Sequence, residues 1–479
     1  MIRIFVTAWL ALLWLAAPAL AEPPPSDKKK FDLTFRRPGH PDTWIRPNVR
    51  WDAAWFAGFN AWAGNAEENI GDETNGFGEI GLVPAIDGQV SLGESGTISG
   101  RLSGVFTTTP LGLDFAGTNF FDGETQSPAK ITLEDFYIRW TSGKLVPTLG
   151  KDAIDLSVGA QTYQIGPGDL GNGFIFHKGG YNGGRRGGFW LGLRNAFQLT
   201  GIARLKTGAF GAEALYLRAD EGGDVFTNVA GVNFDYDFGE LLKLKLAKLG
   251  VGYWNFFDSD NERRDGLNVI NARLDVKPCH CLPGLRLTGE MVKEKNGSKN
   301  DSWGAWGELG YDFQNLPWKP YVSYRWAYFS GEDLREGDNE AFDPLFYGYN
   351  DWNYWYIGEI SGEWVAGNSN LQAGIVRLRM NPIESLTAQL FWIYQRVDQL
   401  EGTQIPPGGN FPPNLDPRVL NITDKDFSHE IDLTFDWSVN DYLSLSFVGA
   451  VLVPLKGGKE FFGNDKTWGQ FMIYWSVKL

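Results

Sequence analysis

Apolar and polar residues alternate with a period of two along segment after segment of this chain. Between 131 and 140, the apolar residues Phe136, Ile138 and Trp140 are interleaved with Asp135, Tyr137 and Arg139. The same pattern recurs at 189–200, 232–238, 270–276, 303–313 and 431–437. Successive side chains of a strand point to opposite faces, so each segment predicts a strand with one apolar and one polar face. Many such strands must form a sandwich or a barrel, and the alternation alone does not separate the two.

The aromatic content favours a barrel in a membrane. Phe, Trp and Tyr make up 15% of the residues, although the mean hydropathy of −0.25 is typical of a soluble protein. In a transmembrane barrel, lipid-facing apolar residues alternate with lumen-facing polar ones, and aromatic residues collect at the two membrane interfaces. We expect interfacial positions for Tyr354, Tyr356, Trp364, Tyr394, Trp437 and Trp475.

The connections and the last segment indicate the same fold. Short turns at 381–384 and 438–441 flank a long polar loop at 398–426, as in barrels with short periplasmic turns and long external loops. The alternating segment that ends at Leu479 resembles the terminal strand of outer-membrane barrels, although many of those end in Phe. With roughly 24 residues for each strand and its connection, we predict an all-β transmembrane antiparallel barrel of about 18 strands, within a range of about 16 to 20.

The N-terminus predicts export. Arg3 precedes an apolar run from Ile4 to Ala17, and a small-x-small pattern ends at Ala21, which is typical of a secretory signal that is cleaved there. The run is shorter than the roughly 18 residues that span a bilayer. We therefore divide the chain into a signal peptide at 1–21, a polar lead at 22–43 and an outer-membrane barrel at 44–479.

Charge and side-chain chemistry argue against several other functions. The formal net charge of −15 argues against a nucleic-acid partner, since an acidic chain repels phosphates. Cys279 and Cys281 flank His280 in a Pro-bounded turn. We expect these residues to belong to an ordinary turn; a small strained disulfide and a metal site are also open, but a fourth metal ligand is missing. Neighbouring strand residues such as Ser428 and His429 point to opposite faces and form no catalytic triad. We expect no metal, no cofactor and no catalysis.

Two segments of the C-terminal half resemble the alginate-export family of outer-membrane porins. The first is YRWAYFSGED at 324–333, followed by EAFDPLFYG at 340–348 and Trp352. The second comprises HEIDL at 429–433, the turn at 438–441 and the strand that begins at Tyr442. The resemblance extends more loosely over 159–217, through YQIG at 163–166 and RNAF at 194–197.

The resemblance implies a monomeric barrel that passes an acidic exopolysaccharide, such as an alginate-like polyuronate, through an arginine-rich constriction without catalysis. It also implies a periplasmic export scaffold as a partner, beside the lipid and lipopolysaccharide of the outer membrane. A porin for another small solute or oligosaccharide is the alternative. The family is broad, so the fold transfers to this chain more safely than the substrate.

Arginines on the polar strand faces are the candidate channel lining. A polyuronate carries a carboxylate on each sugar, and guanidinium groups pair with carboxylates bidentately without deprotonating. Arg325 is the first candidate, because it lies in the family-like segment. The others are Arg139, Arg194, Arg218, Arg273, Arg286, Arg377 and Arg379. Acidic residues share these faces, so ion pairs that merely satisfy charge in the lumen are an equal alternative for each arginine.

Strand counting predicts a gate loop. Counting back from a periplasmic C-terminus places 330–352 in the periplasm, if 366–370 is a short external link. This segment combines acidic residues with apolar anchors, so we expect it to narrow the periplasmic mouth through Asp333, Phe342, Asp343, Phe346 and Tyr347. A missed or merged strand would instead make the segment an external loop.

Overall fold

The structure, a computed structural model, describes residues 33–65, 75–111, 129–165, 176–177, 191–222, 225–239, 244, 246–333, 339–347, 352, 355–404 and 418–479. The predicted signal peptide at 1–21 and most of the predicted lead at 22–43 lie outside these residues. No helix within the described ranges is long and apolar enough to cross a membrane.

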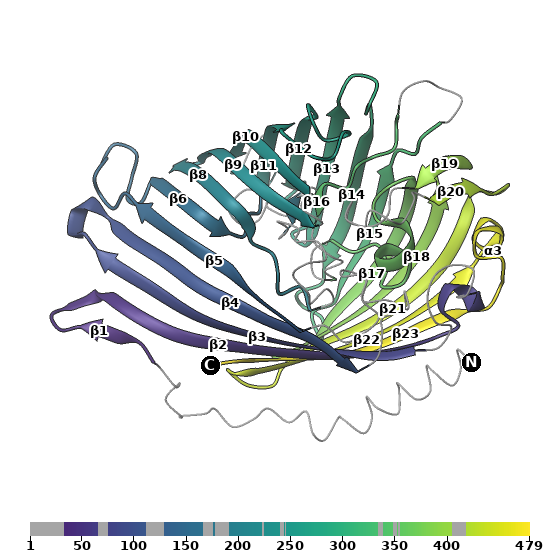
Figure 1. Ribbon diagram of the computed structural model, residues 1–479, viewed down its shortest axis with the longest axis horizontal. Helices are drawn as coiled ribbons and strands as arrows, with labels where there is room; N and C mark the ends of the chain where they lie inside the picture. The colour runs from purple at the N-terminus through teal and green to yellow at the C-terminus, as the bar shows by residue number, and fades with distance from the viewer. Residues whose placement is uncertain are drawn as a thin grey trace.

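Eighteen antiparallel strands form a closed barrel in the described part of the chain (Figure 1). The barrel closes where β23 pairs with β2, with Arg50 opposite Lys478 and Phe59 opposite Gly469. The predicted all-β barrel and its strand number are thereby confirmed. In chain order the strands are β2 (His40–Phe59), β3 (Asn75–Ser91), β4 (Thr97–Leu111), β5 (Ala129–Thr141), β6 (Ile154–Gln161), β8 (Phe197–Thr207), β9 (Phe210–Gly222), β10 (Val225–Asp237), β11 (Leu246–Phe257), β12 (Asn268–Lys277), β13 (Leu285–Lys295), β14 (Trp303–Asp312), β15 (Tyr321–Phe329), β17 (Leu371–Ile383), β18 (Leu386–Val397), β21 (Asp426–Ser438), β22 (Leu443–Pro454) and β23 (Trp468–Lys478).

Short strands and helices occur in addition to the eighteen barrel strands. β1 (Phe35–Arg37) pairs with the beginning of β2, so regular structure starts inside the segment predicted as a polar lead. The others are η1 (Ala61–Gly64), η2 (Gly93–Ser95), β7 (Phe176–His177), β16 (Phe346–Tyr347), η4 (Ser361–Ala366), β19 (Glu401–Gln404), β20 (Arg418–Asn421) and α3 (Lys456–Phe462).

The two faces of the strands differ as the alternation predicts. Along β15 the outward side chains of Val322, Tyr324 and Trp326 are exposed, whereas Ser323 and Arg325 are buried on the lumen side. An exposed apolar belt of this kind is stable only against lipid. Sequence periodicity therefore assigned each side chain of these strands to lipid or to the lumen.

The longest connections between barrel strands lie at one end of the barrel. The turns at 208–209, 384–385 and 439–442 are short and lie at the end where Leu479 finishes the chain, whereas the connections at 162–196, 330–370 and 398–425 are long and lie at the opposite end. Outer-membrane barrels place short turns in the periplasm and long loops outside. We accordingly call the two ends periplasmic and external.

The described parts of two external connections, 162–196 and 330–370, fold into the lumen. We call these connections the first and the second inward loop. β7 of the first inward loop pairs in parallel with β16 of the second. The Phe346 ring packs against Phe197 and Phe256 of the barrel, at centroid distances of 5.4 and 5.8 Å. These rings belong to a buried apolar cluster that also holds Trp355 and Ile357. The described parts of the loops thus narrow the lumen by packing against its apolar wall.

Three sequence predictions need correction. The segment 330–352 lies at the external end, because β15 connects directly to β17 and residues 355–366 form no barrel strand. Tyr356 is not interfacial but buried inside the barrel, at 2% exposure; Tyr354 lies outside the described residues. The strand predicted at 189–200 begins only at Phe197, because 191–196 belongs to an inward loop.

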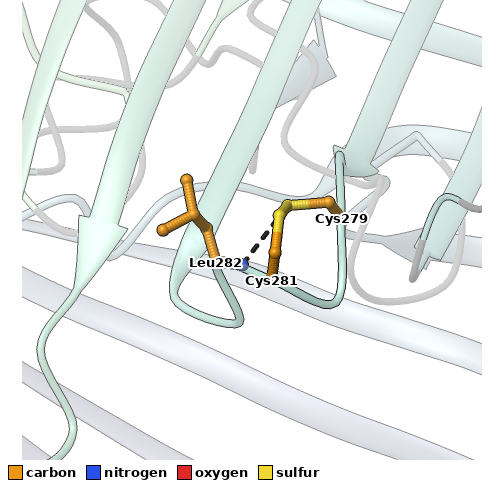
Figure 2. Close-up of a disulfide and its surroundings, with 3 residues drawn as sticks. All are labelled: Cys279, Cys281 and Leu282. Carbon is orange, nitrogen blue, oxygen red and sulfur yellow. Dashed lines mark hydrogen bonds between the residues drawn. A yellow bond between two sulfur atoms is a disulfide. The ribbon is translucent and has the colours of Figure 1, made fainter.

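The periplasmic turn after β12 contains the two cysteines, and Figure 2 shows that they form a disulfide. The Leu282 backbone N–H donates a hydrogen bond to Cys279 Sγ at 3.2 Å. Across the described ranges, no group of three or more His, Cys, Asp or Glu side chains is arranged to hold a metal ion. Of the alternatives that the sequence left open for this turn, the structure has the disulfide.

An arginine-lined cavity in the barrel lumen

Five of the eight predicted arginines line one cavity of about 770 Å³ in the periplasmic half of the lumen. They come from β12, β13, β15 and β17, which lie in one run of adjacent strands around the barrel together with β14. Residues of the periplasmic turns at 283–284 and 313–316 also line the cavity, so it lies beside that mouth. The five are Arg273, Arg286, Arg325, Arg377 and Arg379.

Arg325 is held between a carboxylate and two aromatic rings. Its Nε and Nη2 lie 2.8 and 2.6 Å from Glu308 Oε2 on the adjacent strand β14. Its guanidinium carbon lies 4.8 Å from the ring centroid of Trp306 and 5.1 Å from that of Trp355. Such cation–π contacts fix the plane of the guanidinium. Arg325 is therefore oriented, but its charge is balanced by Glu308.

Arg377 and Arg379 differ from Arg325 in their contacts. Arg377 donates its Nε–H to the neutral Gln389 Oε1 at 2.8 Å, and its Nη2 also contacts that oxygen. Arg379 packs its guanidinium over Tyr321 at 5.0 Å, and its buried Nε lacks a hydrogen-bond partner. Within the described residues, neither arginine forms an ion pair. Glu308, the partner of Arg325, also acts electrostatically on Arg377, so one carboxylate faces three arginines and this group keeps a net positive charge.

The remaining two arginines of the cavity are paired. Arg286 makes a bidentate ion pair with Asp275, through Nε–Oδ1 and Nη2–Oδ2 contacts of 2.7 and 2.6 Å. Arg273 Nη2 lies 2.8 Å from Asp235 Oδ1. For Arg273 and Arg286, the geometry therefore fits the alternative interpretation, in which a lumen arginine only balances the charge of a neighbouring acidic residue.

The other three predicted arginines lie elsewhere. Arg139 pairs with Asp155 in a second lumen cavity of about 650 Å³. Arg218 packs over Phe226 at 4.5 Å. Arg194 lies in the first inward loop, where its Nε donates to Glu134 Oε2 at 2.7 Å in a buried pair. These three are thus not part of the arginine cavity.

The predicted gate residues lie in the second inward loop. Asp343 and Phe342 are buried, and Phe342 packs against Phe329 at 5.4 Å. Phe346 occupies the apolar cluster described above, and Tyr347 pairs its backbone with His177. Asp333 lies at the beginning of the loop and is half-buried.

Beyond these residues, the loop contacts an acidic row that sequence analysis did not single out. Trp352 Nε1–H donates to Asp436 Oδ2 at 2.7 Å, and the Tyr356 hydroxyl donates to Asp432 Oδ2 at 2.6 Å. Both acceptors belong to the lumen face of β21. A small cleft among Trp352, Tyr356, Arg325 and Arg377 marks where this part of the loop meets the arginine cavity. The alternation along β21 could have shown that these acidic side chains face the lumen. The sequence could not show that Tyr356 and Trp352 of the loop would contact them.

Solved structures with a similar fold are bacterial porins. The outer membrane protein OpdK of Pseudomonas aeruginosa is 9% identical, with a TM-score of 0.53, over 91% of this chain and 98% of that chain. OpdK with vanillate gives 10% identity and a TM-score of 0.54 over the same shares. OccAB4 of Acinetobacter baumannii gives 13% identity and a TM-score of 0.52, again over 91% and 98%. A comparison with curated protein sequences gives no match.

The closed barrel, with its apolar outer belt and charged lumen, defines an outer-membrane β-barrel channel, and its location is the bacterial outer membrane. The sequence model described as alginate export matches residues 282–457. This range contains both family-like segments of the C-terminal half, so the resemblance to the alginate-export porins is confirmed there. Family and fold indicate a channel rather than an enzyme. Consistently, His429 stacks on the lipid-side Trp392 at 5.6 Å, away from the buried Ser428 and Glu430.

Proposed function

We propose that the barrel passes an anionic polysaccharide, an alginate-like polyuronate, through the arginine-lined part of its lumen. The observation that carries the proposal is the pair Arg377 and Arg379, which forms no ion pair in the described part of the chain and lines the same cavity as Arg325. A cation held in a low-dielectric wall without a counter-ion is costly. A passing carboxylate relieves this cost, so the site favours anions.

The geometry suits a flexible chain of carboxylates better than a single tight binding event. Arg377 and Arg379 lie on one strand at the i and i+2 positions, so both point to the lumen. Tyr321 supplies ring surface beside both of them, and Trp306 supplies it beside Arg325 in the same cavity. Guanidinium pairs that are only partly saturated can exchange one carboxylate for the next as the polymer advances.

A porin for a small organic acid is the second candidate. The cavity volume of about 770 Å³ falls in the range of small-molecule sites, which is roughly 300–1,000 Å³. OpdK, whose fold is similar, was solved with vanillate. Charge and ring surface at the cavity would serve an aromatic carboxylate as well as a uronate.

The proposed transport also implies the molecules that surround the barrel. Outer-membrane lipid covers the apolar belt, and lipopolysaccharide faces the external end. We propose that the barrel is a monomer and that a periplasmic export scaffold delivers the polymer to the periplasmic mouth. Movement from periplasm to exterior is part of the same proposal and rests on the family resemblance.

Single-channel recording tests the proposal. The purified chain in a planar bilayer should prefer chloride over potassium, and purified oligouronates added on the periplasmic side should block its current. The double variant Arg377→Gln/Arg379→Gln should lose most of the anion preference and of the oligouronate block. An unchanged reversal potential in this variant would contradict the proposal. Block by vanillate without block by oligouronates would select the second candidate.

A further inference from the structure

Three carboxyl groups are buried together where the second inward loop docks on β21. Glu359 of the loop is 5% exposed, and Glu430 and Asp432 of β21 are fully buried. Glu430 Oε1 accepts a hydrogen bond from Ile360 N at 2.7 Å, and Glu430 Oε2 accepts one from Ser361 N at 2.9 Å. These contacts hold the loop backbone directly on the acidic side chains.

The groups that face this cluster are all neutral or acidic. From the loop they are the Tyr356 hydroxyl on Asp432 and the Ser361 hydroxyl on Glu430. From β23, Gln470 Nε2 donates to Glu359 Oε1 at 3.3 Å. From β18, Gln395 Nε2 donates to the Ile357 carbonyl at 2.8 Å. Further along β21, Asp436 holds Trp352. None of the three carboxyl groups makes an ion pair with Lys or Arg in the described part of the chain.

Three carboxylates cannot all remain charged in such a site. Burial penalises each ionised form, and each negative charge penalises the next. Burial and the neighbouring Glu430 raise the pKa of Glu359 to about 8. Asp432 Oδ1 is buried without a hydrogen-bond partner, which fits an oxygen that shares a proton with a neighbouring acid. The docked loop thus requires protons on the cluster.

We propose that Trp352 and residues 355–361 are a pH-operated gate, docked on β21 through Asp436, Glu430 and Asp432 while this carboxyl cluster holds protons and released when the cluster ionises. The gate rests on the channel class, not on the anionic substrate of the proposed function. Release would uncover the cleft beside Arg325 and Arg377, because Trp352 and Tyr356 form one wall of it.

The contact is close enough for charge to act on the loop. A Cβ at Gly358 would lie 2.7 Å from Glu430 Oε2 and 2.6 Å from Ser361 Oγ, and Gly358 has a φ of +118°. Only glycine therefore allows the backbone to approach the carboxyl group in this conformation. Repulsion between ionised Glu359 and Glu430 acts at this point. The part of the loop near Asp343 has its own ion pair with Arg264, so release can be local.

The pH direction follows from linkage. In the docked loop Glu359 keeps its proton up to about pH 8, whereas an exposed glutamate loses it near pH 4.3. Docking is therefore fully stable below the ordinary pKa, weakens as pH rises from there, and has lost this contribution above the docked pKa. For release coupled to one proton, the ratio of docked to released loop should fall about tenfold for each pH unit between the two pKa values and level off above the docked pKa.

Single-channel recording of the full chain between pH 4 and pH 9.5 tests the gate. The wild type should rise in conductance or open probability as pH increases from about 4.3 to about 8, and reach a plateau above that. Glu359→Gln and Asp432→Asn each remove an ionisable group and keep an acceptor oxygen, so both variants should lose most of the rise. The matched control Glu94→Gln, in the exposed periplasmic turn, should keep it. Heat-modifiable mobility on a gel verifies that each variant is a folded barrel.

Two outcomes would overturn the gate: a wild-type conductance that is flat over this pH range, or a full rise in both Glu359→Gln and Asp432→Asn. Either result would leave the anion preference untouched, because that preference is read from reversal potentials at a single pH. Conversely, a channel without anion preference could still show the pH rise and its loss in the variants. The two proposals therefore fail separately.

Discussion

Arg264 and Asp343 form a bidentate ion pair in which both side chains are buried, with Nε–Oδ2 and Nη2–Oδ1 distances of 2.8 and 2.6 Å. Arg264 belongs to the external loop after β11, and Asp343 to the inward loop after β15. The pair therefore fastens the predicted gate segment to the barrel rim. Burial raises and Arg264 lowers the pKa of Asp343, with a net fall below its ordinary value.

Asp343→Asn should loosen the inward loop. Breaking a buried pair by neutralising one partner leaves an unmatched charge and costs about 3–5 kcal/mol. We expect a lower temperature of heat modification on a gel and noisier, larger currents. Asp301→Asn is the matched control, because Asp301 pairs with Lys293 and Lys295 in an exposed external loop and such pairs contribute little. Equal effects of the two variants would contradict the anchoring role of Asp343.

Arg194→Gln should reduce stability without changing selectivity. Arg194 and Glu134 form a buried pair, and Glu134 Oε1 also accepts hydrogen bonds from the backbones of Asn195 and Ala196 at 2.6 and 2.7 Å. The variant therefore disturbs the first inward loop but not the arginine cavity. The measurement is the reversal potential, compared with that of Arg377→Gln/Arg379→Gln. A loss of anion preference as large as in the double variant would show that Arg194 contacts the permeating ion.

Replacing both cysteines with serine should leave the channel intact. The disulfide closes a loop of three residues at the periplasmic mouth, for which the chain-entropy model gives a stabilisation of roughly 1.6 kcal/mol. The variant should assemble and conduct as the wild type does, and it should differ from it only slightly in thermal stability. Titration of the native protein with a thiol reagent should detect no free cysteine. Zinc-dependent conductance or stability would instead favour the metal alternative for Cys279, His280 and Cys281.

The periodicity of two was sufficient to predict the barrel and the lumen face of its arginines. The periodicity could not show which arginines lie next to one another, because the position of a residue along the barrel axis depends on the register between strands. Arg377 lies opposite Ser323 and Arg379 opposite Tyr321, and these pairings are fixed by turn lengths and bulges along the whole sheet. Without the register, the sequence could not show that Arg325 and Arg139 lie in different parts of the lumen. In the structure they line different cavities.

The inward loop was the main error, and its cause is physical. Residues 354–360 are rich in aromatic and β-branched residues, which is typical of a strand. Here the apolar side chains are buried by contacts with the lumen wall rather than by a sheet, as for Trp355 and Ile357 in the apolar cluster. Local pattern does not distinguish these two kinds of burial. Counting this segment as a strand moved 330–352 to the wrong end of the barrel.

Glu308→Gln should increase the anion preference of the channel. Glu308 balances Arg325 through contacts of 2.8 and 2.6 Å and accepts a hydrogen bond from the Tyr321 hydroxyl at 2.9 Å. The glutamine keeps an acceptor oxygen and removes one negative charge, so Arg325 joins Arg377 and Arg379 as an uncompensated cation. Trp306 and Trp355 still hold its guanidinium in place. The reversal potential should shift in the direction opposite to that of Arg377→Gln/Arg379→Gln, and oligouronates should block at lower concentration. Glu94→Gln is the control for the loss of a distant charge. A folded Glu308→Gln barrel with unchanged selectivity would mean that permeating anions do not sense the charge at this cavity.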